Sequence, residues 1–133
     1  MKKTFCLLTL ILSSLLTACV EDNNPTHDYT TWQTITATNA QTIMEESENF
    51  ILLDVRTPTE FQNVRIDGAI LIPYNEINSR AVAELSDKNA IILVYCQSGR
   101  RSASAAADLA ALGFTSVFDF GGILSWPYET VSD

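Results

Sequence analysis

One stretch, Ala90–Leu112, constrains the fold of this chain more than any other. Residues Ala90–Tyr95 are apolar and rich in β-branched types, and the run is too short for an independent helix, so it predicts a buried strand. The sequence Cys-Gln-Ser-Gly-Arg-Arg-Ser follows, and the Ala-rich segment Ser102–Leu112 predicts a helix that Gly113 ends. The pattern therefore places a thiol, Cys96, between a strand and the N-terminus of a helix.

The loop after this strand combines a nucleophile with an anion-binding geometry. A short loop that enters a helix points unpaired backbone N–H groups into one concavity, and the helix dipole adds partial positive charge there. Arg100 and Arg101 add two full charges. In such settings the pKa of a cysteine falls from about 8.5 to about 3.5–7.5, so we expect Cys96 to be a reactive thiolate. The alternative is a buried structural cysteine, which needs neither Gly99 nor the two arginines.

The loop and two further regions of the sequence resemble one known family. Residues Cys96–Ser102 are similar to the active-site loop of rhodanese-like (sulfurtransferase) domains. The stretch Leu52–Phe61, followed by Ile66–Pro73, is similar to the N-terminal signature of that family. Val117–Ile123 with Trp126 is similar to the C-terminal signature. The resemblance runs from about Trp32 to Tyr128. It departs at Val64-Arg65, where such domains often carry Gly-His.

The resemblance implies both a fold and an activity. The fold is an α/β rhodanese-like three-layer fold over residues 31–130, with a central, mainly parallel five-stranded sheet flanked by helices. The activity is that of a thiosulfate sulfurtransferase-like enzyme, in which Cys96 carries sulfur as a persulfide from a small sulfur-containing anion to a thiol or cyanide. The substrate-binding loop would comprise Gln97, Ser98, Gly99, Arg100, Arg101 and Ser102. We expect no cofactor.

Strand-like and helix-like segments also alternate along the chain, which by itself predicts an α/β fold with a mainly parallel sheet. The predicted strands are Trp32–Thr36, Phe50–Val55, Gly68–Pro73, Ala90–Tyr95 and Val117–Phe120. Helices are expected from Thr38 to about Ser47, after Thr57, over Asn75–Leu85 with Ile77, Val82 and Leu85 on one face, and over Ser102–Leu112. Gly121-Gly122 should end the last strand and allow a close backbone approach. Ligands of such sheets bind at the carboxyl ends of the strands, where Cys96 falls.

Asp54, Arg56 and Glu60 follow the second predicted strand, and we assign them supporting roles. Thr57 and Glu60 have the spacing of a capping box, with a proline at the first helical position. Charged residues at strand ends usually form pairs and caps. We therefore expect Asp54 or Glu60 to pair with Arg101 and fix the loop, which leaves Arg100 freer to meet substrate.

The first thirty residues read as export and anchoring signals. Residues 1–18 have a basic start and a short apolar run, and they end in Leu-Thr-Ala before Cys19, which resembles a bacterial lipobox. We expect Cys19 to be lipidated and residues 19–30 to form a polar tether that contains His27, with the domain facing the periplasm. Val20, rather than Asp, after the lipidated position favours the outer membrane. The alternatives are an ordinary secretory signal and an uncleaved anchor.

Composition limits the possible partners and chemistry. The formal net charge of -8 argues against nucleic-acid binding. Cys6 leaves with the signal and Cys19 is acylated, so Cys96 has no partner for a disulfide or dithiol chemistry. The single histidine lies in the tether, so a Cys-His protease and a His/Cys metal site are also disfavoured. We expect a monomer, with no metal.

Two other functions use the same residues. A cysteine phosphatase or arsenate reductase also needs a thiolate in an anion-binding loop, but the spacing from Cys96 to Arg101 is one residue shorter than the phosphatase C-x5-R pattern. The second alternative is a non-catalytic binding module at the membrane. Domains of this kind used in that way often lack the cysteine, so its presence here favours chemistry.

Overall fold

The computed structural model describes residues 32–133, and all five of its strands are parallel members of one sheet. The predicted signal (1–18), the lipidation site Cys19, the tether (19–30) with His27 and the first residue of the predicted domain lie outside the described residues. The strand order is β1-β5-β4-β2-β3. The strands are β1 (Trp32–Thr34), β2 (Phe50–Asp54), β3 (Ile70–Leu71), β4 (Ile91–Cys96) and β5 (Ser116–Gly122).

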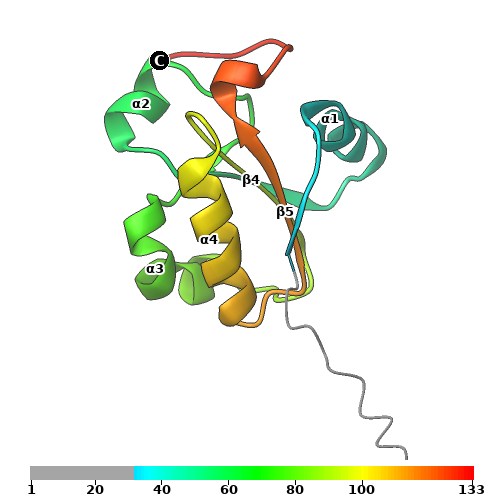
Figure 1. Cartoon of the computed structure of the whole chain (residues 1–133), viewed down its shortest axis with the longest axis vertical. Helices are drawn as coiled ribbons and strands as arrows, with labels where there is room; N and C mark the ends of the chain where they lie inside the picture. The colour runs from blue at the N-terminus through cyan, green and yellow to red at the C-terminus, as the bar shows by residue number, and fades with distance from the viewer. Residues whose placement is uncertain (1–31) are drawn as a thin grey trace, which may run out of the picture.

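Helices cover both faces of the sheet, as Figure 1 shows. Helix α1 lies on one side, and α3 and α4 lie on the other. The helical elements are α1 (Ala37–Glu46), α2 (Pro58–Asn63), η1 (Tyr74–Glu76), α3 (Ile77–Glu84), α4 (Arg100–Ala111) and η2 (Ile123–Ser125). The predicted α/β three-layer fold with a parallel five-stranded sheet is therefore confirmed.

The two halves of the core follow the period-two alternation of β4. Ile92, Val94 and Cys96 pack toward α3 and α4, whereas Leu93 and Tyr95 pack on the opposite side with α1 and η2. Buried Ala105 and Ala106 face the sheet from α4. Because alanine side chains are short, α4 lies close to β4, the strand that precedes it.

The ends of α4 are set by two glycines. Gly99 is its N-cap with φ of 104°, a left-handed conformation that glycine adopts readily, so the helix begins at Arg100 rather than at Ser102. At the other end, Gly113 has φ of 92°, and its N–H donates to Ala110 O at 2.9 Å. Phe114 N–H donates to Leu109 O at 3.1 Å, which completes a Schellman motif. The predicted stop at Gly113 is confirmed.

Two predictions about side chains and strand ends are wrong. Val82 is 50% exposed, because the buried face of α3 is formed by Ile77 and Ala81, with Leu85 directly after the helix. Strand β5 does not end before its glycines but continues through Gly122. It does so through a bulge: Val94 lies opposite Asp119 and Cys96 opposite Gly122, so β5 has one extra residue over this stretch.

A buried ion pair closes the carboxyl end of β2. Asp54 and Arg56 are 0% and 1% exposed, and Arg56 Nη2 lies 2.7 Å from Asp54 Oδ2. Arg56 Nε donates to both carboxylate oxygens at 3.0 Å, and the Arg56 backbone N–H donates to Oδ1 at 2.9 Å. These contacts satisfy two charges that are otherwise costly to bury.

Within residues 32–133, no helix is long and apolar enough to cross a membrane.

The ion pair predicts a strong dependence of stability on Arg56. Replacing Arg56 with methionine fills similar space but leaves the Asp54 carboxylate buried without its cation, so we expect a loss of about 3–5 kcal/mol in unfolding free energy. Urea denaturation at neutral pH measures this loss. Arg80→Met is the matched control, because it breaks an exposed pair with Glu76 and Glu84. Equal losses in the two variants would contradict this reading of the buried pair.

Candidate active site

Cys96 is the last residue of β4, a strand that has a neighbour on each side. The chain then turns through Gln97, Ser98 and Gly99 into α4. The predicted position of the thiol, at the carboxyl end of a strand and the N-terminus of a helix, is the one that the structure has. We call residues Cys96–Ser102 the catalytic loop, after the role that the sequence predicts for them.

The sulfur of Cys96 lies among hydrogen-bond donors. The backbone N–H of Gly99 donates to Sγ at 3.0 Å, and Ser102 Oγ lies 3.5 Å from Sγ. Burial acts to raise the pKa of the Cys96 thiol, but the Ser102 hydroxyl and the N–H groups of Ser102, Gly99 and Ser98 together lower it below its usual value. The loop therefore favours the thiolate mainly through neutral donors, and Arg101 adds an electrostatic interaction with the same residue.

Ser102 holds the loop as well as facing the sulfur. Its hydroxyl oxygen lies 3.0 Å from Gly99 O and 3.2 Å from Gly121 O, and the side chain is fully buried in the first turn of α4. A hydroxyl has one proton, which it donates to one acceptor at a time. A negative charge on Sγ makes the sulfur a stronger competitor for this proton than the two neutral carbonyls.

The bulge in β5 brings the backbone of this strand into close contact with the catalytic loop. A Cβ atom at Gly122 would overlap the carbonyl of Gln97 and lie 2.6 Å from Ser98 Cα. The N–H of Leu124 donates to Gln97 O at 3.2 Å. The Gly121-Gly122 pair thus provides the predicted close approach, although by continuing the strand and not by ending it.

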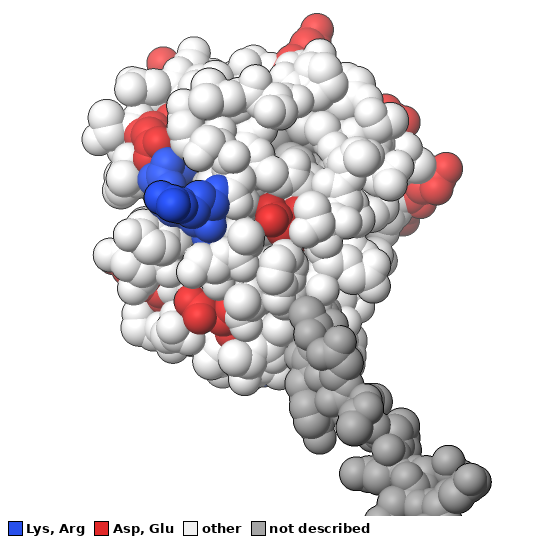
Figure 2. Space-filling view, viewed as in Figure 1, with Lys and Arg blue, Asp and Glu red and all other residues white. Residues whose placement is uncertain are grey.

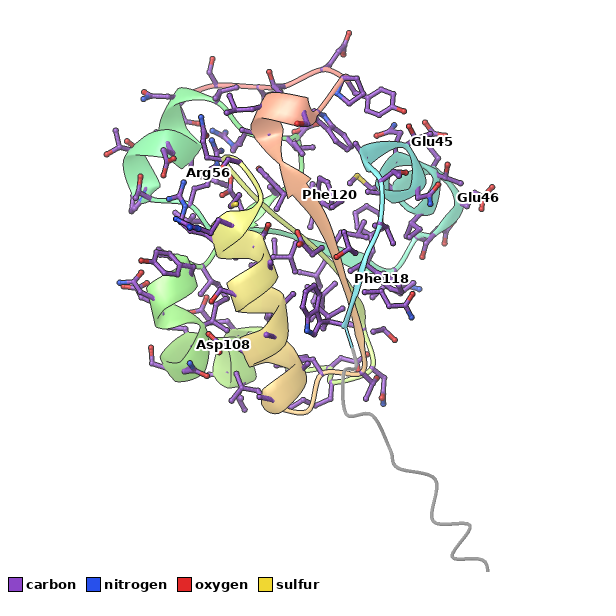
Figure 3. All side chains as sticks on the ribbon, viewed as in Figure 1. Glu45, Glu46, Arg56, Asp108, Phe118 and Phe120 are labelled. Atoms are coloured by element: carbon purple, nitrogen blue, oxygen red, sulfur yellow. The ribbon has the colours of Figure 1, made fainter. Side chains whose placement is uncertain are left out.

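Arg56 connects the buried ion pair to the catalytic loop. Its Nη1 donates to Gln97 Oε1 at 3.1 Å, and its Nη2 donates to Val64 O at 2.6 Å. The guanidinium also lies over the ring of Tyr95, with 5.6 Å to the centroid. In Figure 3 the labelled Arg56 lies beside the loop that precedes α4. Asp54 is therefore the partner of Arg56 and does not pair with Arg101.

Glu60 is the partner of Arg101. Arg101 Nη1 and Nη2 donate to the two Glu60 carboxylate oxygens at 2.9 and 2.8 Å. Glu60 also completes the predicted capping box with Thr57 at the start of α2. The hydrogen bonds from Arg101 hold the pKa of Glu60 at about 2, well below its usual value of 4.5. One carboxylate thus caps a helix and fixes the far end of the catalytic loop.

Arg100 differs from the other arginines of residues 32–133. Arg56, Arg65, Arg80 and Arg101 each form an ion pair at 2.6–2.8 Å, whereas no such pair involves the exposed Arg100. Figure 2 shows the positive side chains on this face of the molecule gathered in one patch, near the N-terminal end of α4. Because the protein as a whole is acidic, this positively charged patch is where a small anion is attracted locally.

A cavity of about 760 Å³ lies elsewhere, between α1 and the segment after η2. Met44, Phe50, Trp126 and Tyr128 are among its lining residues, and no residue of the catalytic loop is. This cavity is therefore separate from the loop that carries Cys96. Trp126 packs on Phe120 with ring centroids 5.4 Å apart, as expected of a core residue.

Sequence reasoning missed the links between the loop and its surroundings. Gln97 and Arg56 are 41 residues apart in the sequence. The other acceptor of Arg56 is the backbone carbonyl of Val64, which a pattern of side chains does not reveal. The one available signal was the departure from the family pattern at Val64-Arg65. Among residues 32–133, no three His, Cys, Asp or Glu side chains gather where they could hold a metal ion.

Comparisons with known proteins identify relatives of this chain. The family model for the rhodanese-like domain matches residues 36–128. Thiosulfate sulfurtransferase PspE of Escherichia coli is 39% identical over 71 residues, which cover 53% of this chain and 68% of that protein. Probable adenylyltransferase/sulfurtransferase MoeZ of Mycobacterium tuberculosis is 37% identical over 102 residues, which cover 75% of this chain but only 26% of MoeZ.

A solved structure agrees with these matches. The structure described as rhodanese with anions from E. coli is 35% identical, has a TM-score of 0.59, and covers 62% of this chain and 98% of its own. It supports the fold assignment. Relatives named as sulfurtransferases make sulfur transfer the activity associated with this family.

The hydrogen bonds to Sγ predict the effect of changing Ser102. In Ser102→Ala the sulfur loses a donor, so the pKa of Cys96 rises and alkylation by iodoacetamide requires a higher pH. The pH dependence of the alkylation rate measures this shift. Ser104→Ala is the control, because Ser104 is exposed on the same helix. A wild-type profile in Ser102→Ala would contradict a role for this hydroxyl in stabilising the thiolate.

The depressed pKa of Glu60 predicts a pH-dependent contribution to stability. A carboxyl group whose pKa is lower in the folded state stabilises that state above its unfolded pKa of about 4.5, and this gain is lost as pH falls through about 2. Wild type should therefore unfold at a higher temperature than Glu60→Gln at pH 7. The difference between their Tm values should shrink between pH 4.5 and pH 2. A constant difference over this range would contradict the assignment.

Proposed function

Because this chain belongs to the family of rhodanese-like domains, we propose that it is a sulfurtransferase that carries sulfane sulfur on Cys96. The donor is a small anion such as thiosulfate, and the acceptor is a thiol or cyanide. One observation carries this proposal: Cys96 Sγ lies at the end of β4, 3.0 Å from the Gly99 N–H at the start of α4. The relative named thiosulfate sulfurtransferase supports the choice of donor.

The first half-reaction is a displacement at sulfur. The Cys96 thiolate attacks the outer sulfur of thiosulfate, a bond forms between the two sulfurs, and the bond to the sulfonate sulfur breaks. Sulfite leaves with the electron pair of the broken bond, and a persulfide anion stays on Cys96. Cys96 is only 1% exposed, so the attacked atom must be small and must stand at the tip of the donor.

The loop stabilises the persulfide through backbone groups. The first N–H groups of α4 have no acceptor within the helix, and the helix dipole adds positive potential at the same place. These groups face the region that the terminal sulfur anion would occupy, as donors do in an oxyanion hole. They are fixed before the reaction by Gly99, Ser102 and Glu60, so the loop needs little reorganisation.

The two loop arginines have different roles in this proposal. Arg101 is held by Glu60 and fixes the loop, whereas exposed Arg100 attracts and orients the sulfonate of the donor. In the second half-reaction, cyanide or a thiolate attacks the terminal sulfur and the Cys96 thiolate leaves. A covalent intermediate between two substrates predicts ping-pong kinetics.

We also propose that the domain works at a membrane. Residues 1–18 would direct export, Cys19 would carry lipid, and residues 19–30 would tether the domain on the periplasmic side. The support is the sequence pattern before Cys19. Replacing Cys19 with serine should release the protein from the membrane fraction, whereas an unchanged membrane fraction would contradict the lipid anchor.

The persulfide is the measurable signature of the proposed chemistry. After incubation with thiosulfate, the intact mass of the domain should increase by one sulfur atom, and cyanide should remove it with release of thiocyanate. Cys96→Ser is the matched control and should gain nothing, because a hydroxyl at this position is a poor sulfur nucleophile. If wild type gains no sulfur while its thiol remains reduced and titratable, the proposed function is wrong.

A further inference from the structure

We propose that Arg65 and the C-terminal segment Val131–Asp133 position the catalytic loop through Arg56. The segment lies beyond residues 36–128, the part matched by the family model, and Arg65 stands where this sequence departs from the family pattern. The proposal deepens the proposed function and rests on it for the role of the loop. It assigns a positioning role to residues that touch no substrate.

The C-terminal segment is bound to Arg65 by both backbone and side-chain contacts. Arg65 N–H donates to Val131 O at 2.8 Å, and Val131 N–H donates to Arg65 O at 2.8 Å, which forms an antiparallel bridge. Arg65 Nη2 also pairs with Asp133 Oδ1 at 2.7 Å. Figure 1 shows the C-terminus beside α2, far along the sequence from the elements that it meets.

Arg65 also packs on the last turn of α2. Its guanidinium lies over the Phe61 ring, 4.9 Å from the centroid, and Nη1 donates to Phe61 O at 3.4 Å. Asp133 N–H donates to Gln62 O at 3.3 Å. The Arg65 side chain is only 20% exposed, so it is packed, although its ion-pair partner Asp133 is 64% exposed.

One peptide unit transmits this contact toward the active site. The carbonyl of Val64 and the N–H of Arg65 belong to the same planar peptide group. The N–H end is held by Val131 O at 2.8 Å, and the carbonyl end accepts from Arg56 Nη2 at 2.6 Å. Because the group is planar, the bond to Val131 fixes the direction in which the Val64 carbonyl meets Arg56.

Arg56 carries the constraint into the catalytic loop. Its other terminal nitrogen donates to Gln97 Oε1 at 3.1 Å, and Gln97 directly follows Cys96. Helix α2, which Arg65 and the C-terminal segment brace, also supplies Glu60 to Arg101. The loop is therefore held near one end by Arg56 and near the other by Glu60. The C-terminal segment completes the contacts that brace both of these residues.

Removal of Val131–Asp133 tests this role. The peptide group of Val64-Arg65 then loses its partner at the N–H end, so the Val64 carbonyl and Arg56 gain freedom and the catalytic loop loosens. We expect alkylation of Cys96 to shift to higher pH and the rate of persulfide formation at saturating thiosulfate to fall about tenfold, with a smaller change in KM. Asp133→Ala, which removes only the ion pair, should show the same changes to a lesser degree.

Two controls separate positioning from general destabilisation. Arg80→Met breaks an exposed arginine pair of similar length and should leave both the alkylation profile and the rate unchanged. Arg65→Lys keeps a positive charge for Asp133 and Arg65→Ala does not, while both keep the backbone bridge, so Arg65→Lys should retain more of the rate. The charged groups around the loop (Asp54, Arg56, Glu60, Arg100, Arg101 and Asp119) are the same in all these variants.

The outcomes decide the proposal independently of the proposed function. A folded truncated protein with wild-type alkylation and a wild-type rate, whatever its Tm, overturns the positioning role. If wild type forms no persulfide, the sulfurtransferase assignment fails, and the alkylation profiles still test the positioning of Cys96. A shift of these profiles in the truncated protein alone, absent in Asp133→Ala, assigns the role to the backbone bridge and removes Asp133 from it.

Discussion

The site depends on one buried guanidinium. Arg56 is 1% exposed, and its nitrogens reach three structural units: the carboxylate of Asp54 at the end of β2, the carbonyl after α2, and the side chain of Gln97 in the catalytic loop. A buried cation has few stable positions, because each N–H that loses its acceptor costs free energy in a medium of low polarity. Arg56 thereby ties the loop to the sheet with a directional constraint that apolar packing does not supply.

Glycine and serine complete this constraint where larger residues do not fit. The β5 bulge brings Gly122 against Gln97 and Ser98, and Gly99 has the left-handed conformation that turns the chain into α4. Ser102 then fills the space between the loop and β5. The result is a sulfur surrounded by fixed dipoles, in which a thiolate is stabilised although it is buried.

The parts predicted from sequence are those that local chemistry determines. The strand, thiol and helix around Cys96, the Thr57–Glu60 capping box and the stop at Gly113 all depend on residues within a few positions of one another. The missed features depend on tertiary packing: the bond from Arg56 to Gln97, the bulge in β5 and the exposure of Val82. For Arg101 the sequence left two partners open, and only the placement of α2 selects Glu60.

The strand order has a consequence for how the chain folds. Strand β1 pairs only with β5 in the described sheet, although these strands lie near opposite ends of residues 32–133. During synthesis from the N-terminus, Trp32–Thr34 therefore waits unpaired until Ser116–Gly122 has been made, and closure of this edge is a late, non-local event. The same β5 carries the glycines that shape the catalytic loop. A nascent chain therefore forms its organised thiol site only after β5 has been synthesised.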